Sequence, residues 1–151
     1  RLQMTVLTKR FLKVMGMLML VGLFANVAHA EQKKVLGDWD VHYIVIPSTF
    51  LTPEIARVND IRRSATNALV NISVLDSRSK AALDVDVSGT ARNLIGTTKN
   101  LDFKTVKEGD AIYYLATVSF DDKEVLRYEI NLQQGNVNQV LRFQQKMYSE
   151  E

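Results

Sequence analysis

The sequence contains no cysteine among its 151 residues. Disulfide bonds, thiolate metal ligands and attachment of a lipid to a cysteine are therefore excluded. Proline, tryptophan and histidine are also scarce, with two, one and two copies respectively. A zinc or copper site normally needs three or four strong ligands, so the shortage of histidine argues against a metal cofactor, and we expect no cofactor.

The N-terminal residues 1–30 have the pattern of a cleavable secretory signal. A basic stretch (residues 9–13) precedes an uncharged apolar run (residues 14–25), and Ala28-His29-Ala30 offers small residues where signal peptidase cuts. The run is too short for a bilayer span, which takes about 20 apolar residues, so a membrane anchor is the weaker interpretation. We expect translation to start at Met4, cleavage before Glu31, and a soluble periplasmic protein with no membrane contact afterwards.

Removal of this leader changes the charge balance. The full chain has 19 lysines and arginines against 17 aspartates and glutamates, and all of the acidic residues follow residue 30. Because four basic residues lie in the leader, the processed chain has 15 basic and 17 acidic residues. No electrostatic argument for nucleic-acid binding remains.

Removal of the leader also leaves only Met147 of the five methionines, which excludes a methionine-rich copper site.

Residues 31–151 read as a single domain made of short strands. Alternating apolar and polar residues separated by turn signals predict an all-β, antiparallel, immunoglobulin-like sandwich of about seven strands, with a small β-barrel as the alternative. Thr52 as N-cap, followed by Pro53 and Glu54, predicts one short helix after the first strand. The strands are expected at about 39–46, 68–75, 82–88, 100–106, 112–120, 125–132 and 141–147, with a loop over 89–96.

The first strand has two different faces. Its odd-numbered face (Trp39, Val41, Tyr43, Val45) is wholly apolar, so we expect it to point into the core. His42 then lies on the opposite face, next to Asp40.

Six segments form a recognisable combination: Gly37-Asp-Trp-Asp-Val-His-Tyr43, Ser48-Thr-Phe-Leu-Thr-Pro-Glu-Ile55, Asn71-Ile-Ser-Val74, Val87-Ser-Gly-Thr90 with Asn93-Leu94, Glu108-Gly-Asp-Ala-Ile-Tyr-Tyr114 and Leu141-Arg-Phe143. Together they resemble a family of small exported proteins of Gram-negative bacteria that is known only as a domain of unknown function. The resemblance extends over residues 31–148. It implies a periplasmic, β-rich domain, and it implies no activity, ligand or catalytic residue.

His42 is the strongest candidate for chemistry, because after cleavage it is the one remaining histidine. It could act as a base or a metal ligand, or it could be a strand histidine bonded to a neighbour. A serine–histidine–aspartate set is disfavoured, because the carboxylate of Asp40 would project alongside the ring. Asp84 and Asp86 lack the spacing of a calcium loop and read as a solvated strand face.

Loops on such scaffolds carry binding residues, so the connection after the first strand is the second candidate. Arg62 and Arg63 could bind an anion or an acidic partner, or could be a surface charge pair. The predicted binding residues are His42, Ser48, Thr49, Glu54, Arg62, Arg63, Arg92 and Asn93; no catalytic residue and no metal ligand is predicted.

Three functions are weighed from these observations. The first is a non-enzymatic binding or assembly module of the cell envelope with a protein partner. The second is a small-ligand or metal carrier centred on His42. The third, an envelope hydrolase, has the least support, and we expect no enzyme activity.

Overall fold

The described part of the chain, residues 31–149 of a computed structural model, consists mostly of antiparallel strands. The predictions for the leader lie outside these described residues. The elements are β1 (Gln32–Leu36), β2 (Trp39–Pro47), the 3-10 helix η1 (Ser48–Phe50), the α-helix α2 (Pro53–Val58), β3 (Asn67–Asp76), β4 (Asp86–Asn93), β5 (Thr98–Leu101), β6 (Lys104–Glu108), β7 (Ala111–Ser119), β8 (Val125–Gln134) and β9 (Val137–Lys146).

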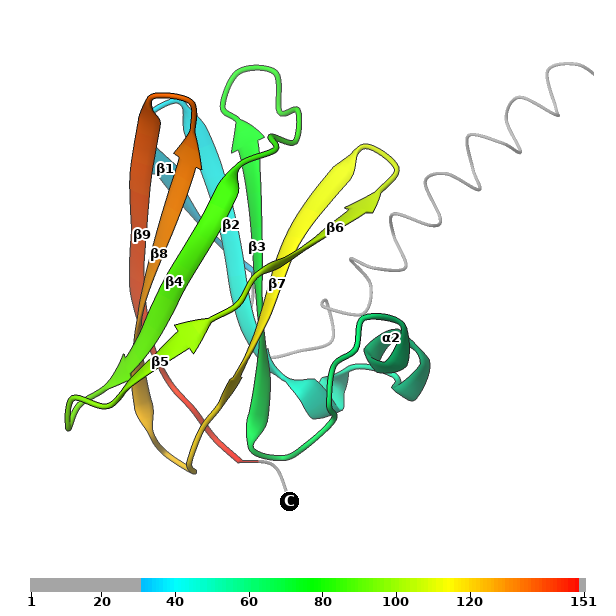
Figure 1. The fold of residues 1–151 in the computed structure, drawn as a ribbon, viewed down its shortest axis with the longest axis vertical. Helices are drawn as coiled ribbons and strands as arrows, with labels where there is room; N and C mark the ends of the chain where they lie inside the picture. Colours follow the sequence, from blue (N-terminus) through cyan, green and yellow to red (C-terminus); the bar gives the residue numbers. More distant parts are fainter. Residues whose placement is uncertain (1–30, 150–151) are drawn as a thin grey trace, which may run out of the picture. The chain divides into compact units, whose positions relative to one another are not determined.

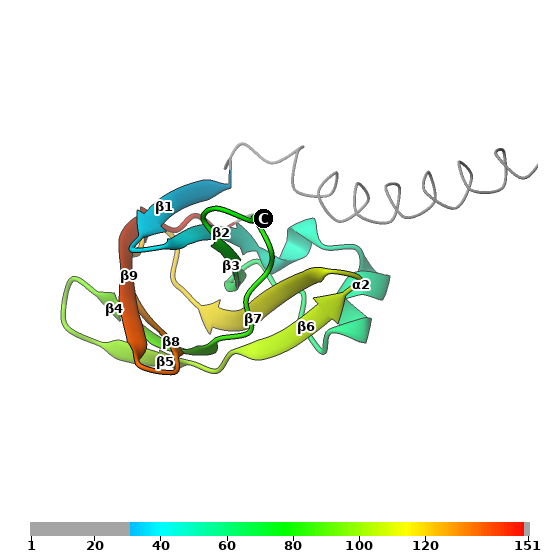
Figure 2. The same cartoon turned by 90° about the horizontal axis from the view of Figure 1, so that it is seen from above.

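The strands form two separate sheets that face each other (Figures 1 and 2). Sheet A has the strand order β1-β2-β3-β7-β6, and sheet B has the order β5-β4-β8-β9. The edge strands β1 and β9 approach each other across the sheets, where the ammonium group of Lys34 donates to the carbonyl of Arg142. The predicted all-β antiparallel sandwich is confirmed, and the alternative of a small closed barrel is wrong.

The strand count is nine in residues 31–149, not about seven. Strand β1 was not predicted, because its residues are nearly all exposed and show no alternation. The expected strand 100–106 is two strands, since the chain crosses from sheet B to sheet A at Asp102 and Phe103.

The expected strand 82–88 and the expected loop 89–96 are also misplaced, because β4 continues to Asn93. Gly89, the first residue of the expected loop, lies inside the strand. A Cβ atom at this position would be 2.7 Å from the carbonyl oxygen of Glu129 on β8. The glycine therefore allows a close approach of β4 and β8 rather than a turn.

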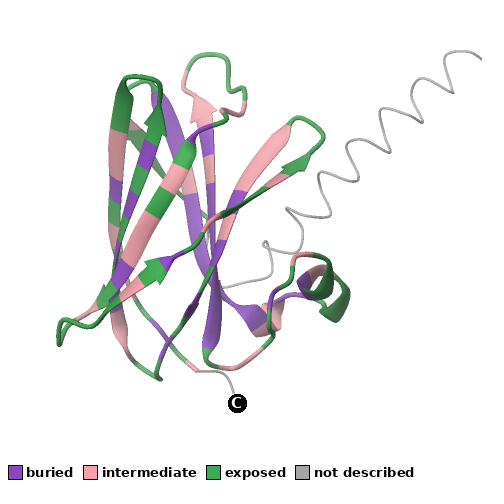
Figure 3. Ribbon diagram, viewed as in Figure 1, coloured by how far each residue is buried: buried purple, intermediate pink, exposed green. Residues whose placement is uncertain are grey.

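The core lies between the two sheets, as the purple stripes along the strands in Figure 3 show. The apolar face predicted for β2 is confirmed, since Trp39, Val41, Tyr43 and Val45 are all buried. Each fully buried aliphatic or aromatic side chain stabilises the fold by about 1.5–3 kcal/mol. At the β9 edge of the core, the partly buried ring of Phe143 stacks between Tyr43 and Tyr128, at centroid distances of 4.4 and 4.7 Å.

The helix prediction is confirmed in detail. The hydroxyl of Thr52 accepts a hydrogen bond from the backbone N–H of Ile55 at 3.3 Å, and Pro53 occupies the first helical turn. The last residue of the helix is Val58, and Asn59 is its C-cap.

Candidate functional site

Three connections leave the strands at one end of the sandwich, which we call the loop end. They are the segment 48–66 between β2 and β3, the turn 94–97 between β4 and β5, and the turn 120–124 between β7 and β8. The backbone N–H of Phe120 donates to the carbonyl of Thr66 at 2.9 Å, which joins the first and third connections. In Figure 1 the loop end is the lower end of the sandwich.

Segment 48–66 is held in a closed loop by polar contacts between its two ends. The hydroxyl of Ser48 donates to the carbonyl of Ser64 at 3.0 Å and accepts from its N–H at 2.9 Å. Arg63 donates from Nε to the carbonyl of Leu51 at 2.8 Å and from Nη2 to that of Thr49 at 3.2 Å. The structure thus brings together three of the predicted binding residues, Ser48, Thr49 and Arg63, and their polar contacts hold the segment in shape.

Glu54 and Arg62 belong to the same segment but do not join this cluster. Glu54 is exposed in the first turn of α2, where its charge favours the helix N-terminus. Arg62 is exposed, and its backbone carbonyl accepts from the amide of Asn67 at 2.8 Å. Both side chains are available to a partner.

His42 is half-buried on the outer face of sheet A, and its Nδ1 lies 3.6 Å from Oε1 of Glu31. The nearby carboxylate of Asp40 is buried and accepts from the ammonium group of Lys80 at 2.5 Å. This hydrogen bond lowers the pKa of Asp40 against the opposing effect of burial. Asp40 is therefore paired with Lys80. Within residues 31–149, no group of three or more histidine, cysteine, aspartate or glutamate side chains is arranged to hold a metal ion.

Arg92 and Asn93 are adjacent on β4 but point to opposite faces of sheet B. Arg92 is exposed on the outer face, in register with Arg127 of β8. Asn93 points inward, and its amide nitrogen donates to Oε2 of Glu124 at 3.0 Å. The two neighbours therefore have different roles, and only Arg92 is free to meet a partner.

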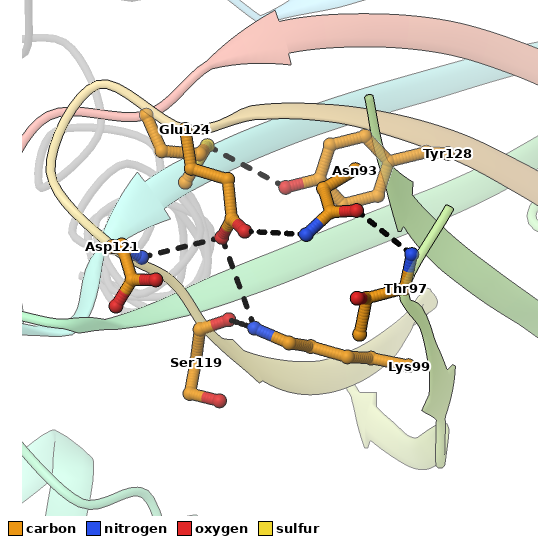
Figure 4. Close-up of polar contacts among 8 residues, drawn as sticks. Asn93, Thr97, Lys99, Ser119, Asp121, Glu124 and Tyr128 are labelled. Atoms are coloured by element: carbon orange, nitrogen blue, oxygen red, sulfur yellow. Dashed lines mark hydrogen bonds and ion pairs between the residues drawn. The ribbon is translucent and has the colours of Figure 1, made fainter. Parts of the chain in front are cut away.

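Glu124 is the centre of the polar network at the loop end (Figure 4). Its Oε1 accepts from the backbone N–H of Asp121 at 3.2 Å and lies 3.8 Å from the ammonium group of Lys99. Lys99 also donates to the carbonyl of Ser119 at 2.6 Å. Asn93, Lys99 and Glu124 thereby connect the turns 94–97 and 120–124.

Burial acts to raise the pKa of Glu124, but the hydrogen bonds from Asn93 and Asp121 and the charge of Lys99 outweigh it. The pKa therefore lies below its ordinary value, and the carboxylate is held ionised. Sequence reasoning selected Asn93 but missed Glu124, because Asp-Asp-Lys-Glu reads as an ordinary solvated turn. No local pattern marks the one carboxylate in that turn whose side chain is only 12% exposed.

The turn 94–97 presents two adjacent aliphatic side chains to solvent. Leu94 is 62% exposed and Ile95 is 89% exposed. The sequence prediction placed this stretch in a loop without assigning these side chains a role. They are the most prominent apolar feature of the loop end.

A cleft of about 150 Å³ lies beside the C-terminal end of α2, between Asp60 and Ile61 on one side and Asp102 and Lys104 on the other. Leu69 and Leu115 on the outer face of sheet A also line it. The predicted binding residues lie outside its lining. No helix in residues 31–149 is long and apolar enough to cross a membrane.

Comparisons with known proteins identify relatives but no activity. The model of the DUF4426 family, described as a domain of unknown function, matches residues 33–150. A search of curated proteins found no match. A crystal structure of a DUF4426 family protein from Pseudomonas aeruginosa is similar with a TM-score of 0.71 and 31% identity, covering 80% of this chain and 97% of that one.

Two more distant structures share the fold alone. FetP from uropathogenic E. coli, crystallised after expression in the periplasm, has a TM-score of 0.56 and 8% identity over 82% of this chain and 97% of its own. A copper-bound variant of FetP has a TM-score of 0.55 and 8% identity over 82% of this chain and 93% of its own.

Proposed function

Because this chain belongs to the DUF4426 family, whose domain has no known function, we propose a role from its own surface: an exported, non-catalytic binding or assembly module of the bacterial cell envelope. The secretory pattern of residues 1–30 supports a periplasmic location. The family member from Pseudomonas aeruginosa, a Gram-negative bacterium, supports it too. FetP, expressed in the periplasm, adds a fold-level analogy.

The observation that supports a binding role most strongly is the use of polar groups at the loop end. Ser48 and Arg63 form hydrogen bonds within segment 48–66, and Asn93 and Glu124 form them between the turns 94–97 and 120–124. Reactive groups need free atoms directed at a substrate, whereas these groups fix the shape of the loops. A surface of fixed shape is what a recognition module presents to its partner.

Helix α2 provides the best contact surface in segment 48–66. Val58 is 67% exposed on this helix, and the charged side chains of Glu54, Arg57 and Arg62 around it are exposed too. An exposed aliphatic group within a polar rim is the usual anatomy of a protein contact. We therefore place the protein partner of this module on the exposed side of α2.

A photo-crosslinking amino acid at position 58, in protein exported by a Gram-negative host, tests this proposal. The expected result is a specific protein adduct that a Glu54→Lys, Arg62→Glu double variant weakens. The matched control places the crosslinker at position 137, where Val137 is 48% exposed at the start of β9. The same adduct from both positions, or none from position 58, would reject the proposed surface.

A second candidate is a metal or small-ligand carrier centred on His42. Two observations favour it: a variant of FetP, which shares the fold, was crystallised with copper, and Glu31 offers a carboxylate 3.6 Å from His42. Titration with Cu²⁺ and Zn²⁺ of the native protein and of His42→Ala separates the two functions. Equal, weak metal binding by the native protein and by His42→Ala would reject the carrier function.

A further inference from the structure

The turn 94–97 is unusual in carrying aliphatic residues at its centre. Such positions are normally occupied by glycine, asparagine, aspartate or serine. Leu94 and Ile95 instead expose 62% and 89% of their surface at the end of the β4–β5 hairpin. They contribute little to the core from there, so the sandwich gives no reason for their apolar character.

The hairpin is held firmly in place. The N–H of Gly96 donates to the carbonyl of Asn93 at 3.2 Å, and the N–H of Asn93 donates to the carbonyl of Thr97 at 3.0 Å. The side-chain oxygen of Asn93 accepts from the N–H of Thr97 at 2.8 Å, and its amide nitrogen is bound by Glu124. The two aliphatic side chains are therefore presented by an ordered turn, which lowers the entropy lost on binding.

A pair of arginines lies on the outer face of sheet B, next to the strand ends from which the turn 94–97 leaves. Arg92 and Arg127 are opposite each other in the β4–β8 register, and both are exposed. Like charges opposite each other destabilise a sheet. In residues 31–149 neither guanidinium forms an ion pair with a carboxylate, whereas the next basic residue on this face, Arg142, lies 3.2 Å from Glu129.

The arginine pair and the aliphatic pair are neighbours. The Nη2 atom of Arg92 lies 3.3 Å from the place where a Cβ atom of Gly96 would be. Its guanidinium thus reaches the turn that carries Leu94 and Ile95. We call these four residues (Arg92, Leu94, Ile95, Arg127) the hairpin tip.

We propose that the hairpin tip docks reversibly on an anionic phospholipid surface. Arg92 and Arg127 bind lipid phosphates, which arginine contacts through paired N–H donors. The phosphates remove the repulsion between the two guanidinium groups. Leu94 and Ile95 enter the boundary between headgroups and acyl chains, where exposed aliphatic groups are stabilised.

The chemistry of the tip favours lipid over a protein pocket. Leucine is under-represented among the residues that dominate the binding energy of protein interfaces, and arginine suits both kinds of partner. A bilayer accepts a protruding aliphatic pair without a preformed pocket. The exposed Asp121 and Asp122 of the adjacent turn are repelled by an anionic surface. This repulsion favours an orientation in which the hairpin tip, and not the turn 120–124, faces the membrane.

This docking goes beyond the proposed function, because it concerns a different surface from α2. The cleavable signal pattern and the lack of a cysteine for lipid attachment predict no membrane contact for the processed chain, and the hairpin tip revises that expectation for the membrane surface only. Surface docking needs no membrane-spanning helix. A single acyl chain gives only marginal membrane binding, and two short side chains with two charges should likewise bind reversibly.

The absence of cysteine allows a direct test with one introduced label. Ile95→Cys, purified after export and labelled with an environment-sensitive fluorophore, is mixed with vesicles of phosphatidylcholine alone or with an equal part of phosphatidylglycerol. We expect a blue shift with the anionic vesicles that high salt reverses. The control, Val137→Cys, carries the label on an exposed valine at the start of β9 and should show no shift.

Co-sedimentation of unlabelled variants with the same vesicles then measures how much the aliphatic pair and the arginine pair each contribute to vesicle binding. Replacing Leu94 and Ile95 by serine should weaken binding roughly 100-fold. Replacing Arg92 and Arg127 by glutamine should weaken it roughly 30-fold and remove the preference for anionic lipid. The controls Val137→Ser and Arg142→Gln should bind as the native protein does, and circular dichroism confirms that each variant is folded.

Three outcomes would overturn the proposal. They are no binding of the native protein to anionic vesicles, equal binding by the serine and native proteins, and a specific protein adduct instead of lipid from a crosslinker at position 95. Failure of the vesicle test leaves the crosslinking test at position 58 unaffected, so the two proposals fail separately.

Discussion

The two ends of the sandwich are built in different ways. At the end opposite the loop end, which we call the turn end, three hairpins close with two-residue turns that begin with Gly37, Gly109 and Gly135. These glycines have φ angles of 60°, 59° and 57°. Glycine at the first central position is typical of a type II′ turn, whose twist matches that of the strands. An added Cβ atom at Gly109 or Gly135 would meet nothing within 4 Å, so local backbone geometry accounts for these two turns.

The loop end depends on contacts between residues far apart in the sequence. Asn93 and Glu124 are 31 positions apart, and Ser48 and Ser64 are 16 apart. One connection at the turn end, residues 77–85, follows the same principle, because the hydroxyl of Tyr114 accepts from the N–H of Val85 and donates to the carbonyl of Leu83. The comparison teaches that the tight turns rest mainly on the backbone conformation of a glycine. The shape of the loop end instead requires specific side chains.

The largest expected effect follows from removing the carboxylate at the loop end. Glu124→Leu leaves the amide nitrogen of Asn93 and the N–H of Asp121 without a partner and removes the carboxylate beside Lys99, so it should lower the free energy of unfolding by about 3 kcal/mol. Urea denaturation measures this change. Glu129→Leu, which removes an exposed partner of Arg142, should change it by less than about 0.5 kcal/mol. Similar small losses in both variants would contradict the assigned role of Glu124.

Tyr114→Phe tests the long connection at the turn end. Loss of the hydroxyl leaves the N–H of Val85 and the carbonyl of Leu83 without partners, and should cost about 2 kcal/mol. Thermal and urea unfolding check the value, with Tyr148→Phe as a control, because that ring is 51% exposed. A loss no larger than in the control would show that water replaces the hydroxyl and that residues 77–85 need no such anchor.

Gly109→Ala tests the tight turns, and its expected effect is smaller. A Cβ atom at Gly109 meets nothing within 4 Å, so the cost comes from the positive φ angle alone and should be about 1 kcal/mol. Asp110→Ala, in the same turn, serves as the control. If Gly109→Ala destabilised the protein more than Glu124→Leu, the comparison of the two ends would be wrong.

The smallest effect is a change in the pH dependence of stability. Glu124 has a pKa below its ordinary value of 4.5 in the folded state, so the unfolded state binds more protons below that pH. Its contribution to stability is present above about pH 4.5 and is lost as the pH falls through the lowered folded pKa. Glu124→Gln should flatten the decline of unfolding free energy in acid, whereas Glu129→Gln should leave it unchanged. An unchanged decline in Glu124→Gln would contradict the lowered pKa.

Periodicity made some elements predictable and others not. The apolar face of β2 and the capped helix α2 were predicted from their residues, because burial of one strand face and satisfaction of helix N–H groups are local properties. Strand β1 could not be predicted, since an exposed edge strand has no apolar alternation. The break between β5 and β6 was missed as well, because the chain changes sheets there without a glycine or proline to mark it.

In the candidate site, too, local features could be predicted from the sequence and long-range contacts could not. Ser48, Thr49 and Arg63 were selected for their position after a strand, and the structure brings them together. Their contacts with main-chain groups of the same segment could not be anticipated, because those groups meet only after the segment has folded back. Glu124, Lys99 and the arginine pair Arg92–Arg127 depend on strand pairing, which the alternation of one strand does not specify.

The sequence by itself determined the expected export signal, the class of fold and the scarcity of metal ligands, because composition, period and turn residues act locally. Only the tertiary structure decided which polar groups are buried, which cations lie opposite each other and which aliphatic pair is left in solvent. Those properties arise when strands from distant parts of the chain are placed in register, so no single segment encodes them.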